Sequence, residues 1–109
     1  MAERLSTFLK IFGDTPRLRV LDFFMVHEEF DYSMTDIAKE SGVGYSTLKM
    51  LWPALEKNGI VIMTREVGKA KLYRINGSNN TVKDFKQLYW RMTKARTRRL
   101  LTEKIIARN

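Results

Sequence analysis

The feature that most constrains this chain is a glycine turn between two short helical patterns. The first pattern begins at Ser33-Met34-Thr35-Asp36, which has the form of a capping box, and it ends at Ser41-Gly42-Val43-Gly44. Gly42 can adopt a left-handed conformation without steric cost, which allows a sharp turn. The second pattern, residues 45–58, has apolar residues at helical spacing. These are Leu48, Leu51, Trp52 and Leu55. The segment therefore predicts two short helices that cross closely at Ala38.

A β-hairpin is predicted directly after these helices. Residues 60–67 are apolar and β-branched, and residues 70–75 alternate as a returning strand. Gly68-Lys69 between them is a dipeptide typical of tight turns. The hairpin, residues 60–75, is expected to carry basic side chains around its tip.

Helical patterns flank this unit on both sides. Residues 3–12 have apolar side chains at helical spacing and stop at Gly13, and a second helix starts at Pro16 with Thr15 as its cap. From Thr81 to about Arg108 there is neither Gly nor Pro, which predicts one long amphipathic helix. We expect a single domain, 1–109, that is mainly α with a small β-hairpin. It has an N-terminal helix in 1–13, a central unit in 15–77 and a C-terminal helix in 81–108.

The run TDIAKESGVGYSTLKMLWPALEKNGIV, residues 35–61, resembles the winged helix-turn-helix of ArsR- and MarR-type transcription regulators. Residues 16–21 also resemble the ArsR-type helix that precedes this unit. The resemblance implies a regulator, in most cases a repressor, whose second helix enters the major groove of double-stranded DNA. The candidate reading residues at the start of that helix are Gly44, Tyr45, Ser46, Thr47, Lys49 and Met50.

Most of these candidates also have a purely structural interpretation. Tyr45 can cover the edge of the core, and Met50 can lie at the core margin. Ser46 and Thr47 can serve as local backbone partners. Pro53 lies inside the predicted helix, where it removes an N–H and predicts either a tolerated kink or a bend that fits the groove.

The hairpin corresponds to the wing in this resemblance. Its basic residues are Arg65, Lys69, Lys71 and Arg74, with Glu66 as the single acid among them. The resemblance places such residues on the minor groove or on flanking phosphates. Phosphate contacts of this kind set affinity and salt dependence rather than sequence choice.

Charge is distributed unevenly along the 109 residues. Residues 1–60 hold seven basic and nine acidic residues, whereas residues 61–109 hold thirteen basic and three acidic ones. This asymmetry indicates a polyanionic partner, most often nucleic acid. The densest cluster consists of Lys94, Arg96, Arg98 and Arg99. This cluster fits a solvated helix face, contacts with flanking DNA phosphates, or an acidic protein partner.

In the families that the chain resembles, terminal helices pair to form a two-fold dimer. The two terminal helices here carry large apolar residues that one small domain is expected not to bury by itself. These are Leu5, Phe8, Leu9, Phe12, Phe85, Leu88, Tyr89 and Met92. We therefore expect a homodimer that binds an imperfect palindrome.

The composition argues against several other classes of protein. Without cysteine, and with His27 as the one histidine, the chain has no set of ligands for a metal sensor. No catalytic constellation or phosphate loop is present, so we expect neither an enzyme nor a cofactor. No signal peptide or membrane-length apolar run is found, which predicts a cytoplasmic, nucleoid-associated protein. The alternatives are an architectural or plasmid-partition DNA-binding protein, and a winged-helix module that binds protein or RNA.

Overall fold

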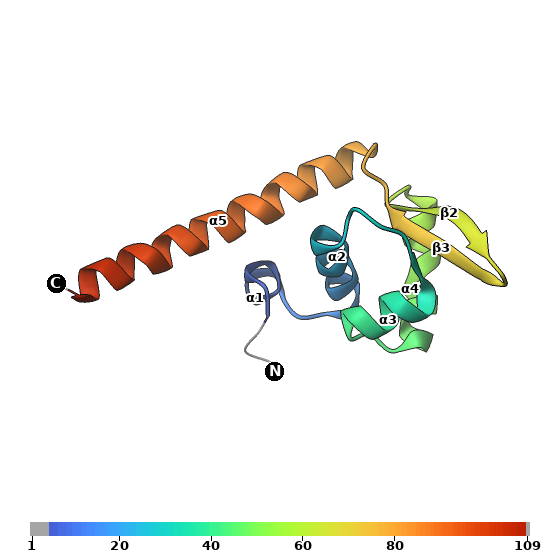
Figure 1. The fold of residues 1–109 in the computed structure, drawn as a ribbon, viewed down its shortest axis with the longest axis horizontal. Helices are drawn as coiled ribbons and strands as arrows, with labels where there is room; N and C mark the ends of the chain where they lie inside the picture. The colour runs from blue at the N-terminus through green and yellow to red at the C-terminus, as the bar shows by residue number, and fades with distance from the viewer. Residues whose placement is uncertain (1–4, 109) are drawn as a thin grey trace.

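The computed structural model describes residues 5–108, which form five helices and one small sheet (Figure 1). The elements follow the predicted order. They are α1 (Thr7–Phe12), α2 (Pro16–Val26), β1 (Tyr32–Ser33), α3 (Met34–Ser41), α4 (Tyr45–Lys57), β2 (Val61–Val67), β3 (Ala70–Ile75) and α5 (Asn80–Arg108).

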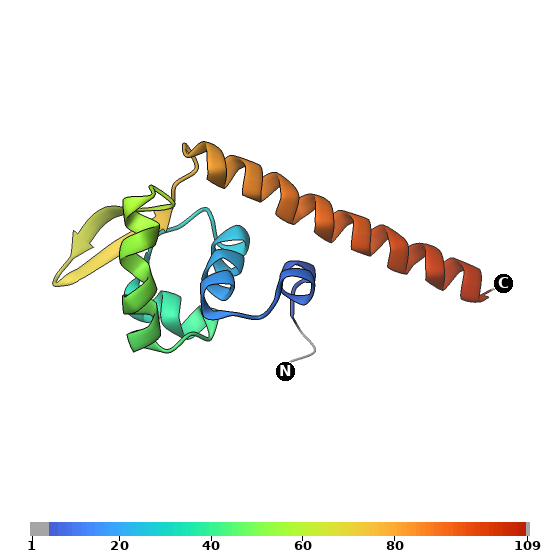
Figure 2. The ribbon, with the colours of Figure 1, turned by 180° about the vertical axis from the view of Figure 1, so that it is seen from behind.

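The molecule consists of a body and an arm. Helices α2, α3 and α4 and the sheet form the body, and α5 runs from the base of the sheet past α2 and α1 into open space (Figures 1 and 2). The described chain measures 59 × 30 × 22 Å, and most of its length comes from this arm. A helix of 29 residues, the length of α5, is about 43 Å long.

Side-chain capping sets the starts of the helices in the body. Thr15 Oγ1 accepts a hydrogen bond from Leu18 N, and Ser33 Oγ accepts one from Asp36 N. Helix α1 begins at Thr7 rather than at Glu3, because Ser6 Oγ accepts from Leu9 N and caps the helix there. The part of the prediction that covers residues 3 and 4 lies outside the described residues.

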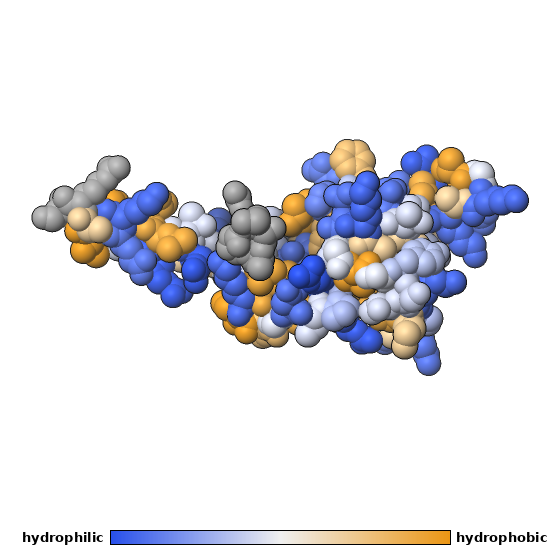
Figure 3. Space-filling view, turned by 90° about the horizontal axis from the view of Figure 1, so that it is seen from below, coloured by the Kyte–Doolittle hydropathy of each residue, from blue (hydrophilic) through white to orange (hydrophobic). Residues whose placement is uncertain are grey.

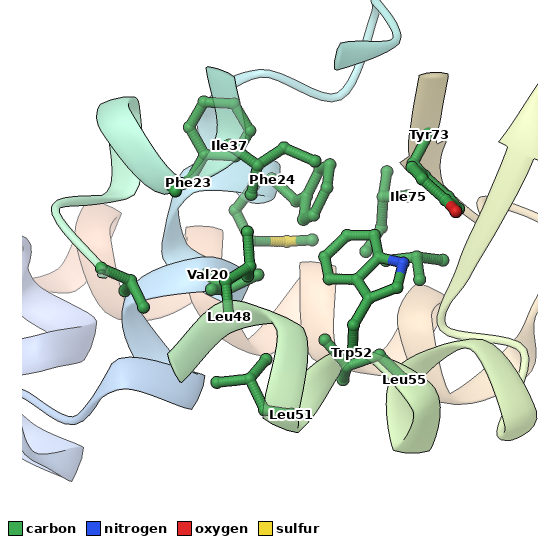
Figure 4. Close-up of a cluster of buried hydrophobic side chains, with 14 of the residues drawn as sticks. Val20, Phe23, Phe24, Ile37, Leu48, Leu51, Trp52, Leu55, Tyr73 and Ile75 are labelled. Carbon is green, nitrogen blue, oxygen red and sulfur yellow. The ribbon is translucent and has the colours of Figure 1, made fainter. Parts of the chain in front are cut away.

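The core of the body is built from the faces that the helical periodicity predicts. Trp52 of α4 packs edge-on against Tyr73 of β3, with their ring centroids 5.0 Å apart (Figure 4). Leu48, Ile37 and Val20, which come from α4, α3 and α2, are fully buried beside them. Because three helices and the sheet all contribute to this core, packing fixes the position of α4 relative to the base of the sheet, where Val61, Tyr73 and Ile75 are buried.

The sheet is antiparallel with the strand order β1-β3-β2. The hairpin turns at Gly68, whose φ is 62°, as the Gly68-Lys69 dipeptide predicts. The register of β2 against β3 shifts between Met63 and Arg65, so Thr64 is the extra residue of a β-bulge. This bulge is not visible in the sequence pattern, and it decides which way Arg65 points.

Helix α5 divides into a packed half and a free half. Val82 and Tyr89 are buried against the body, and Phe85 and Met92 are half-buried. From Thr97 to Ala107 every residue is exposed, and Figure 3 shows apolar side chains at the free end of the arm. The large exposed apolar side chains there are Leu100, Leu101, Ile105 and Ile106.

The predicted dimer residues therefore separate into two groups. Phe8, Leu9 and Tyr89 are buried within the chain's own core, with the ring centroids of Phe8 and Tyr89 5.7 Å apart. The expectation that one chain leaves them unburied is wrong, because α1 folds back under α5. Phe12 and Leu88 are exposed, at 53% and 44%. Leu5, Phe85 and Met92 are half-buried at the margin of the core.

Within residues 5–108, no helix is long and apolar enough to cross a membrane. His27 caps the C-terminal end of α2 and stacks on Phe23, with 4.6 Å between the ring centroids. His27 is thus an exposed residue at the end of a helix, in contact with Phe23.

Candidate nucleic-acid interface

The turn between α3 and α4 has the geometry that its glycine predicts. Gly42 has a φ of 73°, and its N–H bonds the carbonyls of Ala38 and Lys39. Val43 and Leu48 are buried at the corner between the two helices. A residue with a Cβ at position 42 would be strained in this conformation, and its Cβ would also lie 2.6 Å from Arg19 Nη1. The turn thus holds α4 in one orientation against α3.

The first two turns of α4 present the predicted reading residues to solvent. Gly44, Tyr45, Ser46, Thr47, Lys49 and Met50 are all exposed, and Met50 is the most open large apolar side chain at 83%. Lys49 Nζ lies 5.7 Å from the centroid of the Tyr45 ring, which places the ammonium over the ring face. No side chain caps the start of α4, since Gly44 occupies the N-cap position. The core-margin interpretation of Met50 is therefore wrong.

Pro53 lies within α4 without ending it. The helix continues from Tyr45 to Lys57, with Pro53 exposed on its surface while Trp52 and Leu55 are buried. Packing of these two apolar side chains holds the turn that the missing N–H weakens.

Two wing residues share a hollow with the start of α4. Lys69 and Lys71 line a hollow of about 470 Å³ together with Tyr45 and Thr35. Lys71 is on the same face of the sheet as Tyr73, which packs toward α4. Thr35, in the first turn of α3, was not among the predicted site residues. The capping sequence in which it stands would have been the signal to include it.

The other two basic wing residues lie on the opposite face of the sheet. Arg74 alternates with Tyr73, and its Nη2 donates to the carbonyl oxygens of Glu28 (3.3 Å) and Glu29 (3.2 Å). Arg65 is paired with Leu72 across the strands, and its guanidinium binds both carboxylate oxygens of Asp31. Arg65 and Thr64 donate to Asp31 and lower the pKa of its carboxyl to about 2. The four predicted wing residues are thus not brought together in one place.

The basic cluster of α5 lies away from this hollow. Lys94, Arg98 and Arg99 are exposed on α5, and Arg96 is half-buried just before its free half. Among the residues that the structure describes, the ion pairs are Arg19–Asp14, Arg65–Asp31 and Lys86–Glu28. The lysines at the hollow and the cluster on the arm therefore form no ion pair with other described residues.

The surface around the hollow offers positive charge and hydrogen-bond donors. Within the described part of the chain, no group of three or more His, Cys, Asp or Glu residues is placed to hold a metal ion. The arrangement of α3, turn and α4 with an adjoining hairpin is suited to contact an extended polyanion. The start of one helix can enter a groove while the hairpin lies against the backbone.

Comparisons with solved structures identify this arrangement. No protein-family model matches the chain, and no curated protein matches it in sequence. MepR, a transcription regulator of the Staphylococcus aureus multidrug efflux pump MepA, superposes with a TM-score of 0.62 at 16% identity, covering 93% of this chain and 78% of MepR. The chain has a winged helix-turn-helix fold. In the nomenclature of this fold, α4 corresponds to the helix called the recognition helix and β2–β3 to the wing.

Two other solved structures share the fold. One is the homodimeric winged helix-turn-helix DNA-binding domain of a possible ArsR-family regulator from Mycobacterium bovis. It has a TM-score of 0.52 at 21% identity, covering 94% of this chain and 82% of that one. The other is Lactococcus lactis ZitR in complex with DNA, with a TM-score of 0.55 at 10% identity, covering 83% of this chain and 67% of ZitR.

Proposed function

We propose that this protein is a homodimeric transcription regulator, a repressor, that binds a specific sequence of double-stranded DNA. The observation that carries this proposal is that the exposed start of α4 adjoins the wing, with Tyr45, Lys69 and Lys71 lining one hollow. In this proposal, Tyr45, Lys49 and Met50, which are exposed, contact base edges in the major groove. Lys69 and Lys71 bind the backbone or the minor groove beside it.

The proposal narrows the set of wing residues that contact DNA. Lys69 and Lys71 are on the side of the sheet that faces α4, whereas Arg65 and Arg74 hydrogen-bond the loop after α2. We therefore assign DNA contact to the two lysines and a structural role to the two arginines. Solved structures with the same fold support DNA as the partner, since one of ZitR and one of a MepR variant contain DNA or an oligodeoxyribonucleotide.

A homodimer is proposed from the apolar surface that the arm leaves uncovered. Leu101 and Ile105 lie one helical turn apart on the free half of α5, and Phe12 adds an exposed ring on α1. A second copy that covers this surface would give two recognition helices for two half-sites, about 34–36 Å apart on DNA. The structure from Mycobacterium bovis supports this assembly, because that domain is homodimeric. A protein of this function acts in the cytoplasm on the nucleoid, without catalysis or a cofactor.

Fluorescence anisotropy with labelled DNA tests the proposal. The wild-type chain is titrated with its own upstream region and with random DNA at several salt concentrations. Lys69→Ala and Lys71→Ala are each expected to lower the slope of log affinity against log salt by about 1. Lys49→Ala is expected to reduce the preference for the specific sequence. Lys57→Ala, at the far end of the same helix, is the matched control and is expected to leave the slope unchanged.

Other outcomes would identify one of the alternative functions. Equal affinity for specific and random DNA would indicate an architectural or plasmid-partition protein. Unchanged DNA affinity in a Lys49→Ala, Lys69→Ala double variant would contradict the proposed interface. It would favour a module that binds an acidic protein or RNA through the cluster on α5, which lies apart from the recognition helix.

A further inference from the structure

The loop between α2 and β1, residues 28–31, receives contacts from both the wing and the arm. Arg74 of β3 donates to the backbone carbonyls of Glu28 and Glu29. Lys86 of α5 pairs with the Glu28 carboxylate, with Nζ 2.7 Å from Oε1. This loop is therefore held in place by contacts with both β3 and α5.

Asp31 makes the contacts of this loop with β2, and they fall at the bulge. Thr64 is the extra residue there, and its hydroxyl donates to Asp31 Oδ2. Arg65 follows, with Nε 3.0 Å from Oδ2 and Nη2 3.2 Å from Oδ1. The Asp31 side chain is 17% exposed and that of Arg65 is 63% exposed. One carboxylate on the body thus binds two consecutive residues of the wing.

The wing beyond this point has little else to hold it. Every residue from Ile62 to Lys71 is exposed, and an isolated two-stranded hairpin is only marginally stable in water. A bulge bends its strand and increases the local twist, so the direction of the hairpin is decided where the bulge lies. Contacts that fix the bulge will fix the positions of Lys69 and Lys71.

We propose that Asp31 is a wing-positioning residue. By binding Thr64 and Arg65 at the bulge, it sets the angle at which Lys69 and Lys71 stand beside the start of α4. The importance of this angle for DNA rests on the proposed function, but the positioning of the wing does not. Both parts can be measured separately.

Amide hydrogen exchange of the free protein tests the positioning without DNA. In Asp31→Asn, the amides that pair β2 with β3 beyond the bulge, residues 65–71, are expected to exchange about two to five times faster than in wild type, the range that loss of one exposed ion pair allows. Amides of α3 and α4 serve as the internal reference and are expected to keep their rates. Unchanged rates in residues 65–71 would overturn the proposal.

DNA affinity then separates positioning from simple charge neutralisation. If Asp31 positions the wing, Asp31→Asn and Arg65→Gln both weaken binding by a similar factor. The double variant is then no weaker than either single one. If Asp31 only neutralises an Arg65 that itself contacts phosphate, Asp31→Asn tightens binding, whereas Arg65→Gln weakens it and lowers the salt slope by about 1. The second pattern would overturn the proposal.

Glu66→Gln is the matched control for charge. Glu66 is an exposed carboxylate in the same strand, next to Arg65. Its replacement changes the net charge by the same amount as Asp31→Asn but leaves the bulge contacts intact, so it is expected to strengthen binding slightly. Opposite effects of the two variants support positioning, and equal effects contradict it. If the wild-type chain does not bind DNA at all, the proposed function fails while the exchange result still decides the role of Asp31.

Discussion

Replacing Gly42 with alanine is expected to destabilise the turn between α3 and α4 for two reasons. The left-handed backbone strains an alanine, and the new Cβ lies too close to the Arg19 side chain. At a φ of 73° an alanine is strained by about 1–2 kcal/mol. Alanine also restricts the unfolded chain, which favours folding by about 0.4–1 kcal/mol. The conformation alone therefore costs about 1 kcal/mol, or roughly 4–8 °C in Tm for a domain of this size. The new methyl group also displaces the end of the Arg19 side chain, which is flexible, so this contact adds a smaller cost than the backbone strain.

Two other glycines allow these effects to be measured separately. Gly68 has a φ of 62°, and a methyl group added there would meet no neighbouring side chain or backbone within 4 Å, so Gly68→Ala reports strain alone. Gly77 has neither a positive φ nor a close neighbour, so Gly77→Ala is expected to be neutral or slightly stabilising. Urea denaturation followed by Trp fluorescence or circular dichroism gives the free energy of unfolding of each variant. The expected loss of stability is largest for Gly42→Ala, then Gly68→Ala, then Gly77→Ala.

An Arg19→Ala background completes the experiment. In that background the cost of Gly42→Ala should fall to that of Gly68→Ala, because no guanidinium remains for the new methyl group to displace. Equal stability of Gly42→Ala and Gly77→Ala would refute the requirement for a left-handed residue at the turn. A cost of Gly42→Ala that Arg19→Ala leaves unchanged would refute the contribution of the contact.

Three further predictions concern the core, the wing and the arm. Leu48→Ala, at a fully buried position, should lower the free energy of unfolding by about 2–5 kcal/mol in urea denaturation. Met50→Ala, on the exposed face of the same helix, should change it by no more than about 0.5 kcal/mol. Equal losses would contradict the assigned faces. Because the pKa of Asp31 is lowered from 3.8 to about 2, the stabilisation from its pair with Arg65 is present above pH 3.8 and is lost as the pH falls through about 2. The urea midpoints of wild type and Asp31→Asn should therefore converge as the pH falls across that range, and a constant difference would argue against the pair. Replacing Leu101 and Ile105 by serine should convert the proposed dimer to a monomer in sedimentation velocity, while the circular dichroism signal of the helices in the body stays the same. An unchanged mass would place the dimer interface elsewhere.

The helix-turn-helix was predictable because its signals are local. A glycine that must be left-handed, a capping serine and apolar residues at helical spacing each act within a few positions of one another. The exposure of Lys49 and Met50 follows from the same periodicity, once Leu48 and Trp52 are assigned to the core. These parts of the site needed no knowledge of distant contacts.

The wing and the terminal helices were harder to predict because long-range contacts decide them. Without the bulge at Thr64, strand alternation would place Arg65 on the same face as Lys71, and no residue type in the sequence marks the bulge. Phe8 and Tyr89 were expected at a dimer interface, but the chain reverses after α1 and packs them together. Periodicity identifies an apolar face, and it does not show whether that face is covered by the same chain or by another one.

The division of the wing into two faces affects how a protein of the proposed function can acquire a new target sequence. The arginines that hold the hairpin to the body and the lysines proposed to contact DNA are different residues on different sides of one ribbon. Substitutions at 69 and 71, like those at 45, 46, 49 and 50, alter exposed side chains that the fold does not require. Under the proposed function, a library randomised at 45, 46, 49 and 50 should stay folded while its preferred DNA sequence changes, whereas changes at 69 and 71 should alter mainly the affinity and its salt dependence.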